Sequence, residues 1–152
     1  MRDIDTIDHK ILQQLQRNSD DSLEDIGARI GLSRNAVWRR IKALEDTGII
    51  KKRLAVLDPS RLGLGLMVFI QLRTSNHSAE WLGQFTRAVS TIPEIQGAFR
   101  MTGDLDYLIQ ARVSDVSDYD ALYQRLISKV DMTDVSASFV MEEIKNTTEL
   151  PI

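Results

Sequence analysis

The chain has 152 residues, a formal net charge of −3, no cysteine, 43% hydrophobic residues and 27% charged residues. This length accommodates one ordinary domain or two small ones, and the apolar fraction is typical of a soluble globular protein. The composition excludes disulfides, and the sequence contains neither a signal peptide nor the roughly 20 apolar residues that span a membrane. We therefore expect a cytoplasmic protein that does not contact a membrane.

The charge is unevenly distributed along the chain. Residues 29–53 contain eight Lys or Arg and two acidic residues, a net charge of +6. Residues 1–28 and residues 61–152 each carry a net charge of −4. A basic stretch inside an acidic chain indicates a local surface for a polyanion such as DNA, rather than a uniformly basic protein.

Two short helices are predicted near the N-terminus. Residues 6–16 have apolar side chains at the spacing of one helix face. A second helix is predicted to start after Ser22, a good N-cap, and to end at Gly31, which suits a left-handed C-cap. Gly27 leaves room for a crossing helix.

A third helix is predicted to begin after Ser33, with Val37, Ile41 and Leu44 facing inward. Its opposite side is basic and aromatic, and Arg and Asn side chains suit guanine and adenine edges while Lys suits phosphate. This arrangement predicts the recognition helix of a helix-turn-helix motif. Its DNA-facing residues are Ser33, Arg34, Asn35, Trp38, Arg39, Arg40 and Lys42.

Two alternatives stay open for this helix. Its basic side can be an ordinary solvated face without a partner. Trp38 can lie on the DNA backbone, or it can pack its ring against the neighbouring helix.

Residues 49–56 are predicted to form a short extended segment or a hairpin arm. Lys51 and Lys52 at its start would reach phosphates beside the groove, as in a winged helix-turn-helix. The alternative is a charged turn. A break near Pro59 divides the chain into two predicted domains, residues 1–58 and residues 59–152.

The second domain alternates between strand and helix patterns. The order is strand, helix, strand, strand, helix, strand, the ferredoxin-like βαββαβ arrangement with two helices on one sheet face. The predicted ranges are 66–73, 78–91, 95–102, 107–113, 117–130 and 135–144, with a turn at 103–106. The fold class is therefore α+β.

An enzymatic function finds little support in the sequence. His9 and His77 lack the spacing of metal ligands. Glu142 and Glu143 are adjacent on a predicted strand, so they point to opposite faces and cannot act as a pair. Nucleophile-elbow and phosphate-loop motifs are absent. We expect a protein that is not an enzyme and that uses no metal and no cofactor.

The run GLSRNAVWRRIKALEDTGII, followed by a βαββαβ pattern containing MTGDLDYLI and a closing TTELPI, resembles the Lrp/AsnC (feast/famine) family of transcriptional regulators. The resemblance covers essentially the whole chain. It implies an N-terminal winged helix-turn-helix with a linker strand, and a C-terminal RAM-type domain that forms oligomers and binds an amino acid. It also implies dimers, often octamers, on pseudo-palindromic operators in double-stranded DNA.

The resemblance places the amino-acid effector near the loop at residues 101–107. Carboxylates there would meet the ammonium group and backbone N–H groups around Gly103 would meet the carboxylate. The alternative is a simple hairpin turn with solvated serines on the last strand. The candidate effector residues are Met101, Thr102, Gly103, Asp104, Asp106, Tyr107, Ser136 and Ser138.

The uncovered face of the predicted sheet is apolar, so a two-fold homodimer is physically expected. The sequence thus predicts a DNA-binding regulator whose assembly or DNA binding responds to a small amino acid as allosteric effector. The alternative is an accessory subunit that senses an amino acid and regulates an enzyme, with a non-functional helix-turn-helix.

Overall fold

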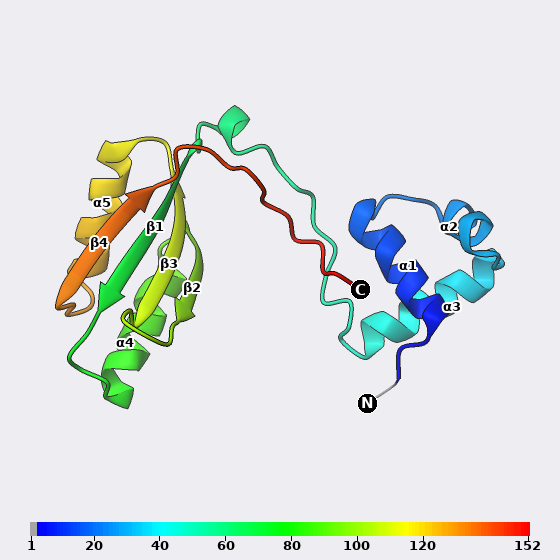
Figure 1. Cartoon of the computed structure of the whole chain (residues 1–152), viewed down its shortest axis with the longest axis horizontal. Helices are drawn as coiled ribbons and strands as arrows, with labels where there is room; N and C mark the ends of the chain where they lie inside the picture. Colours follow the sequence, from blue (N-terminus) through cyan, green and yellow to red (C-terminus); the bar gives the residue numbers. More distant parts are fainter. Residues whose placement is uncertain (1–2) are drawn as a thin grey trace. The chain divides into compact units, whose positions relative to one another are not determined.

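The computed structural model describes residues 3–152 and divides the chain into two compact units (Figure 1). The first unit contains the residues up to Val56 together with Lys145–Ile152, and the second contains Leu57–Ile144. The sequence predicts a boundary two residues later and places the C-terminal residues in the second domain. Among the helices of the described residues, none combines the length and hydropathy required to cross a bilayer.

The first unit contains the three predicted helices, α1 (Thr6–Arg17), α2 (Leu23–Ile30) and α3 (Arg34–Asp46). Each begins at a side chain that accepts a hydrogen bond from the free N–H groups of the first turn: Asp5, Ser22 and Ser33. At α1 this is a reciprocal capping box between Asp5 and Asp8. The local sequence therefore fixes where all three helices start.

The turn between α2 and α3 depends on two glycines. Gly31 adopts a left-handed conformation with φ of 76°, which favours glycine. Gly27 packs against the backbone of the turn, where its carbonyl accepts the Leu32 N–H at 2.9 Å. A Cβ atom at Gly27 would collide with the Leu32 carbonyl oxygen. The closest approach at Gly27 is thus made by the turn, and the crossing helix α3 also contacts this position through Val37.

The core of the first unit is small. Its buried members are Ile11, Leu12, Ile26, Val37, Ile41 and Leu44, from all three helices. After α3, residues 51–58 are exposed and belong to no helix or strand, so the segment does not form a hairpin arm. Leu54 and Val56 in it are 64% and 92% exposed.

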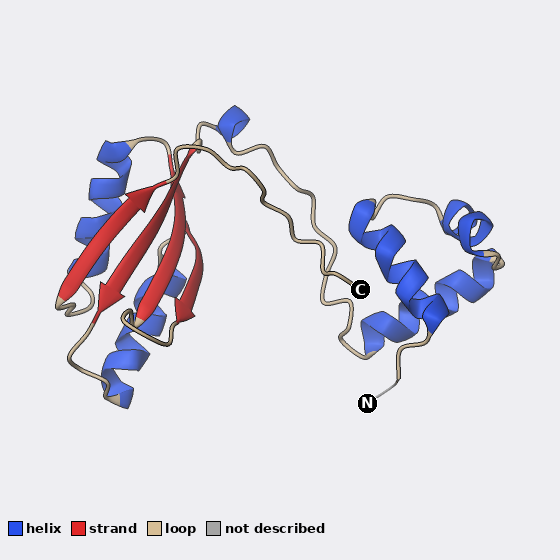
Figure 2. Cartoon of the chain, viewed as in Figure 1, coloured by secondary structure: helices blue, strands red, loops and turns tan. Residues whose placement is uncertain are grey.

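The second unit is the predicted βαββαβ domain (Figure 2). Its four strands are antiparallel in the order β2-β3-β1-β4, which confirms the α+β fold class. The elements are a short 3-10 helix at Ser60–Leu62, then β1 (Leu66–Arg73), α4 (Ala79–Thr91), β2 (Ile95–Arg100), β3 (Tyr107–Val113), α5 (Val116–Ile127) and β4 (Asp134–Phe139).

The last strand is shorter than predicted. After Phe139, Val140 N donates to Met67 O of β1 at 2.9 Å, and Met141 is then fully exposed. Glu142 and Glu143 therefore lie beyond the strand, not on it. The Glu143 carboxylate pairs with Arg112, a buried cation on β3.

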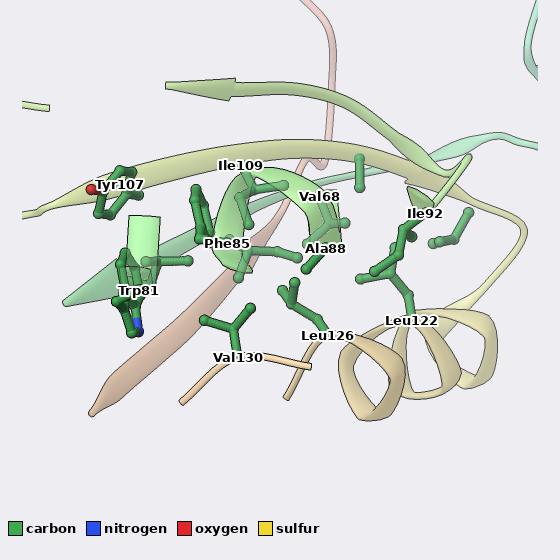
Figure 3. Packing of buried hydrophobic residues seen from close by; sticks show 14 residues of the cluster. Val68, Trp81, Phe85, Ala88, Ile92, Tyr107, Ile109, Leu122, Leu126 and Val130 are labelled. Carbon is green, nitrogen blue, oxygen red and sulfur yellow. The ribbon is translucent and has the colours of Figure 1, made fainter. Parts of the chain in front are cut away.

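The two helices cover one face of the sheet and enclose the larger core (Figure 3). Trp81 and Phe85 of α4 pack with Tyr107 of β3, with ring centroids 4.6 to 5.4 Å apart. Strand alternation then sends every second side chain to the opposite face. That uncovered face carries Phe69, Phe99, Leu108, Ser136 and Ser138, as the register of the strands places them together.

Candidate DNA interface and effector site

The two sides of α3 differ as predicted. Val37, Ile41 and Leu44 are buried, between 0% and 4% exposed. Trp38 is 57% exposed, so its ring is outside the helical core, and both alternatives for it, the DNA backbone and the neighbouring helix, stay predictions. The other predicted DNA-facing residues of α3 that are exposed are Arg34, Asn35, Arg39 and Lys42. An exposed helix face of cations, an amide and an aromatic ring fits the major groove and its phosphates.

Two cations of this side form exposed ion pairs. Arg34 lies 2.7 Å from Glu24, and Lys42 lies 3.0 Å from Asp46, whose hydrogen bond and charge raise the pKa of Lys42. Such exposed pairs contribute little to stability, so phosphate oxygens can replace the carboxylates. Within residues 3–152 the structure gives Arg39 no carboxylate partner. Among the cations of α3, Arg39 is therefore the one that contributes no ion pair to the described part of the fold.

Arg40 has a different position from its neighbour. Its Nη1 atom lies 2.7 Å from Asp5 and 2.8 Å from Asp8, and the Asp8 side chain is 1% exposed. These hydrogen bonds raise the pKa of Arg40, and they join α3 to the start of α1. Arg40 therefore has a part in the fold, because its guanidinium neutralises a buried carboxylate, and its contact with DNA stays a prediction.

The residues that flank α3 in the predicted DNA surface are exposed and lie outside helices and strands. The Ser33 hydroxyl accepts the Ala36 N–H at 3.3 Å as the N-cap of α3, and its own proton remains available to a phosphate. Lys51 and Lys52 lie in the exposed segment after α3. Arg53, the next cation, lies 3.0 Å from Glu45. These residues extend the basic surface beyond α3.

The loop between β2 and β3 is a closed hairpin. Met101 N donates to Asp106 O at 2.8 Å, and Gly103 has φ of 97°. Asp106 Oδ2 accepts the Thr74 N–H at 2.8 Å, so this carboxylate also holds the end of β1. Met101, Thr102 and Asp104 are exposed. The loop is therefore a turn that presents an exposed carboxylate, which fits both the predicted effector site and the alternative of a simple hairpin turn.

Tyr107 does not share the exposure of this loop. It is 5% exposed and packs against Trp81 and Phe85 in the core. The reason is the strand register, which places Tyr107 opposite Leu72, so that both side chains enter the core. Tyr107 follows the loop directly in the chain, but its ring lies on the face of the sheet that the helices cover.

Arg73 joins the loop to the last strand, and the sequence did not single it out. Its Nε atom donates to the Asp104 carbonyl at 2.7 Å, and its Nη1 atom lies 3.3 Å from Asp134 Oδ2. The signal available in the sequence is a cation that ends an apolar strand. Its partners became visible only with the pairing of β1 and β4.

Ser136 and Ser138 lie on β4 opposite Gln71 and Phe69 of β1. Both are exposed, and they share the uncovered face of the sheet because Val135 and Ala137 between them pack against the core. The prediction that the two serines share a face is confirmed. Asp134, the partner of Arg73, is two residues from Ser136, so Arg73 places the loop near this end of β4.

These features define a helix-turn-helix DNA-binding protein with a separate α+β domain. Two family models match the chain: "Winged helix-turn-helix DNA-binding" at residues 4–51 and "Lrp/AsnC ligand binding domain" at residues 67–150. The chain therefore belongs to the Lrp/AsnC family of transcriptional regulators. It combines a DNA-binding domain with a ligand-binding domain, and it is a regulator rather than an enzyme.

Two relatives are similar in sequence over nearly the full length of this chain. The glutamate uptake regulatory protein of Zymomonas mobilis is 45% identical over 152 residues, covering 100% of this chain and 93% of the relative. The DNA-binding transcriptional activator DecR of Escherichia coli is 43% identical over 150 residues, covering 98% and 99%.

Solved structures share the fold. An AsnC family transcriptional regulator from Agrobacterium tumefaciens has a TM-score of 0.93 and 46% identity, covering 97% of this chain and 96% of that chain. A transcriptional regulator from Neisseria meningitidis, solved as a complex with L-methionine, has a TM-score of 0.93 and 36% identity, covering 98% and 97%.

Proposed function

We propose that this regulator binds DNA through the exposed side of α3 and that a small amino acid bound to its second domain controls that binding. Asn35, Trp38, Arg39 and Lys42 enter the major groove. Ser33, Arg34, Lys51 and Lys52 contact phosphates. The observation that carries this assignment is the separation of α3 into a buried apolar side and an exposed basic side. We place this activity in the cytoplasm, together with the DNA.

The proposed effector site is the end of the sheet where Arg73 joins the β2–β3 loop to β4. The exposed carboxylate of Asp104 receives the ammonium group, and N–H groups beside Gly103 receive the carboxylate of the amino acid. Met101 and Thr102 flank these groups, and Ser136 and Ser138 add hydroxyls from the sheet face. The L-methionine complex of the Neisseria relative supports an amino acid as the ligand.

Two residues of the predicted effector set have a supporting part. Asp106 positions the loop through its hydrogen bond to Thr74. Tyr107 anchors the loop in the core. Neither side chain needs to touch the ligand for the site to form.

We further propose a homodimer, and larger assemblies such as an octamer, on a pseudo-palindromic operator. The support is the uncovered sheet face, where Phe99 is 50% exposed and Phe69 and Leu108 are only partly buried. Isolated exposed apolar residues are common, but several on one sheet face favour a partner. Sedimentation velocity tests this proposal, because a species of 17.2 kDa at micromolar concentration would contradict it.

A thermal-shift screen against the twenty amino acids tests the effector site. A ligand at about 100 times its Kd adds about 2.7 kcal/mol to the native state, so the bound amino acid raises the Tm. Asp104→Ala should abolish that rise, and Asp120→Ala, an exposed carboxylate on α5, should retain it. If Asp104→Ala keeps the full rise, the ligand is held elsewhere.

A further inference from the structure

The C-terminal segment, residues 145–152 (here called the tail), belongs to the first unit although it follows the second in sequence. Its hydrogen bonds join it to α1. Gln16 Oε1 accepts the Leu150 N–H at 2.6 Å, and Gln16 Nε2 donates to Leu150 O at 3.2 Å. Gln13 Nε2 donates to Ile152 O at 2.5 Å. The two glutamines are three residues apart, so they share one face of the helix.

The pairing has the form of a recognition site for a peptide backbone. A glutamine carboxamide carries the same donor and acceptor as a peptide group, and Gln16 uses both on one residue, as a neighbouring β-strand would. Pro151 has no N–H to satisfy, and Ile152 N bonds to Leu150 O at 3.0 Å. The last three residues therefore present a compact set of backbone groups that suits this face of α1.

We propose that Gln13 and Gln16 form a docking site for the last three residues of the same chain, which makes the tail a reversible strap from the ligand-binding domain to the DNA-binding domain. The strap starts at the sheet, where Glu143 pairs with the buried Arg112 of β3. It ends on α1. With the tail docked, the helix-turn-helix is joined to the second unit twice: covalently between Val56 and Leu57, and by hydrogen bonds to the tail, whose chain leaves the second unit after Ile144.

The nature of the contact makes the strap reversible. Leu150 is 67% exposed and Ile152 is 40% exposed, so hydrogen bonds hold the tail with little apolar burial. Exposed hydrogen bonds exchange readily with water and open without unfolding the core. The exposed side of α3 takes no part in them. The tail can therefore be docked or released without using the exposed side of α3.

Thiol crosslinking in the full chain tests the docking, because the natural sequence has no cysteine. The double variant Gln13→Cys/Ile152→Cys is treated with a short bismaleimide, since the docked backbones are separated by a glutamine side chain and suit this reagent better than a disulfide. Gln16 still holds Leu150 in this variant. The matched control is Gln14→Cys/Ile152→Cys, because Gln14 faces Arg29 of α2 instead.

We expect the Gln13 pair to give several-fold more intrachain product than the Gln14 pair. Adding Gln16→Ala should reduce it to the control level while circular dichroism stays unchanged, because Gln16 is outside the core. Equal yields in both pairs would overturn the docking site. A product of twice the chain mass would overturn docking within one chain and show that the tail binds a second copy.

Hydrogen exchange of the unmodified protein tests reversibility. The backbone amides of residues 147–150 and of Ile152 should exchange far faster than those of α1 around Ile11. If both exchange at the same slow rate, the tail is a permanent part of the helical core and the strap is not reversible. These outcomes do not depend on ligand or DNA, so they are distinct from a failure of the proposed effector site.

Discussion

The two candidate sites of this protein differ in how they share residues with the fold. On α3 the buried residues and the proposed DNA-facing residues lie on opposite sides of one helix. In the β2–β3 loop, residues of the proposed ligand site also stabilise the fold. The Asp106 carboxylate accepts a hydrogen bond from Thr74 N–H, and the Asp104 carbonyl accepts one from Arg73. Function can therefore be removed from α3 without changing the fold, whereas substitutions in the loop affect geometry as well as ligand contacts.

The two cores differ in a related way. The first has six buried residues between positions 11 and 44, and the second has fourteen that reach from Val68 to Val130. The strands of the second core pair residues far apart in sequence, such as Val68 with Phe139. The first unit thus depends on fewer side chains, and each is more important to it.

The largest expected effect is a selective loss of the first unit. Leu44 is fully buried, so Leu44→Ala removes core contacts and leaves a cavity, at a cost of about 2–5 kcal/mol. DNA binding should be lost while the second unit stays folded and keeps its ligand. Calorimetry with and without ligand measures this. If both units unfold in one transition at the lowered temperature, they are a single cooperative body and the comparison is wrong.

A smaller effect separates the neighbours Arg40 and Arg39. Arg40→Ala removes a charged hydrogen bond from the buried Asp8, and bonds to charged groups contribute about 2 kcal/mol. The free energy of unfolding of the first unit should fall by about this amount. Denaturation in urea measures that free energy, with Arg39→Ala as the matched control. Equal stability of the two variants would show that Arg40 has no special part in the fold.

The smallest effect is an acid sensitivity of the first unit. The Asp8 N–H and Arg40 hold the pKa of Asp5 below its ordinary value. A carboxylate with a lowered pKa stabilises the fold above its unfolded pKa, about 3.9, and this contribution disappears as the pH falls through the folded value. Asp5→Asn, which keeps the N-cap, should reduce the loss of Tm between pH 6 and pH 3. The same loss in both proteins would exclude this pair as a cause.

A corresponding pair lies in the second unit and provides the comparison. Arg125 holds the pKa of Glu94 below its ordinary value, also by a hydrogen bond. Glu94→Gln should therefore alter the acid response of the second transition and leave that of the first unchanged.

Local patterns predicted much of the fold because caps and periodicity act over a few residues. Ser22 and Ser33 predicted the starts of α2 and α3, and the spacing of apolar residues predicted that of α1, whose cap, Asp5, the structure adds. The ranges of β1 and β3 agree with the predicted ones, since both are apolar strands at the centre of the sheet. The exposed side of α3 was predictable for the same reason.

What the sequence could not show depends on contacts between distant residues. Arg40 looks like its neighbour Arg39 until α1 brings Asp5 within 2.7 Å, across 35 positions of the chain. Arg73 acquires its role only through Asp104 and Asp134, which lie 31 and 61 positions away. The tail is the strongest case, because its partners on α1 are more than 130 positions distant.

The central claim is that the exposed side of α3 binds DNA and has no part in the fold, and Arg39→Ala tests it most directly. Affinity for a labelled fragment that the natural protein binds, such as the DNA upstream of its own gene, is measured by fluorescence anisotropy together with Tm and oligomer mass. A lost contact to a base edge is worth about 1–3 kcal/mol, so affinity should fall roughly 10- to 100-fold with Tm and mass unchanged. Arg87→Ala, an exposed arginine on α4, should bind as the natural protein does. Unchanged affinity in Arg39→Ala would contradict the account.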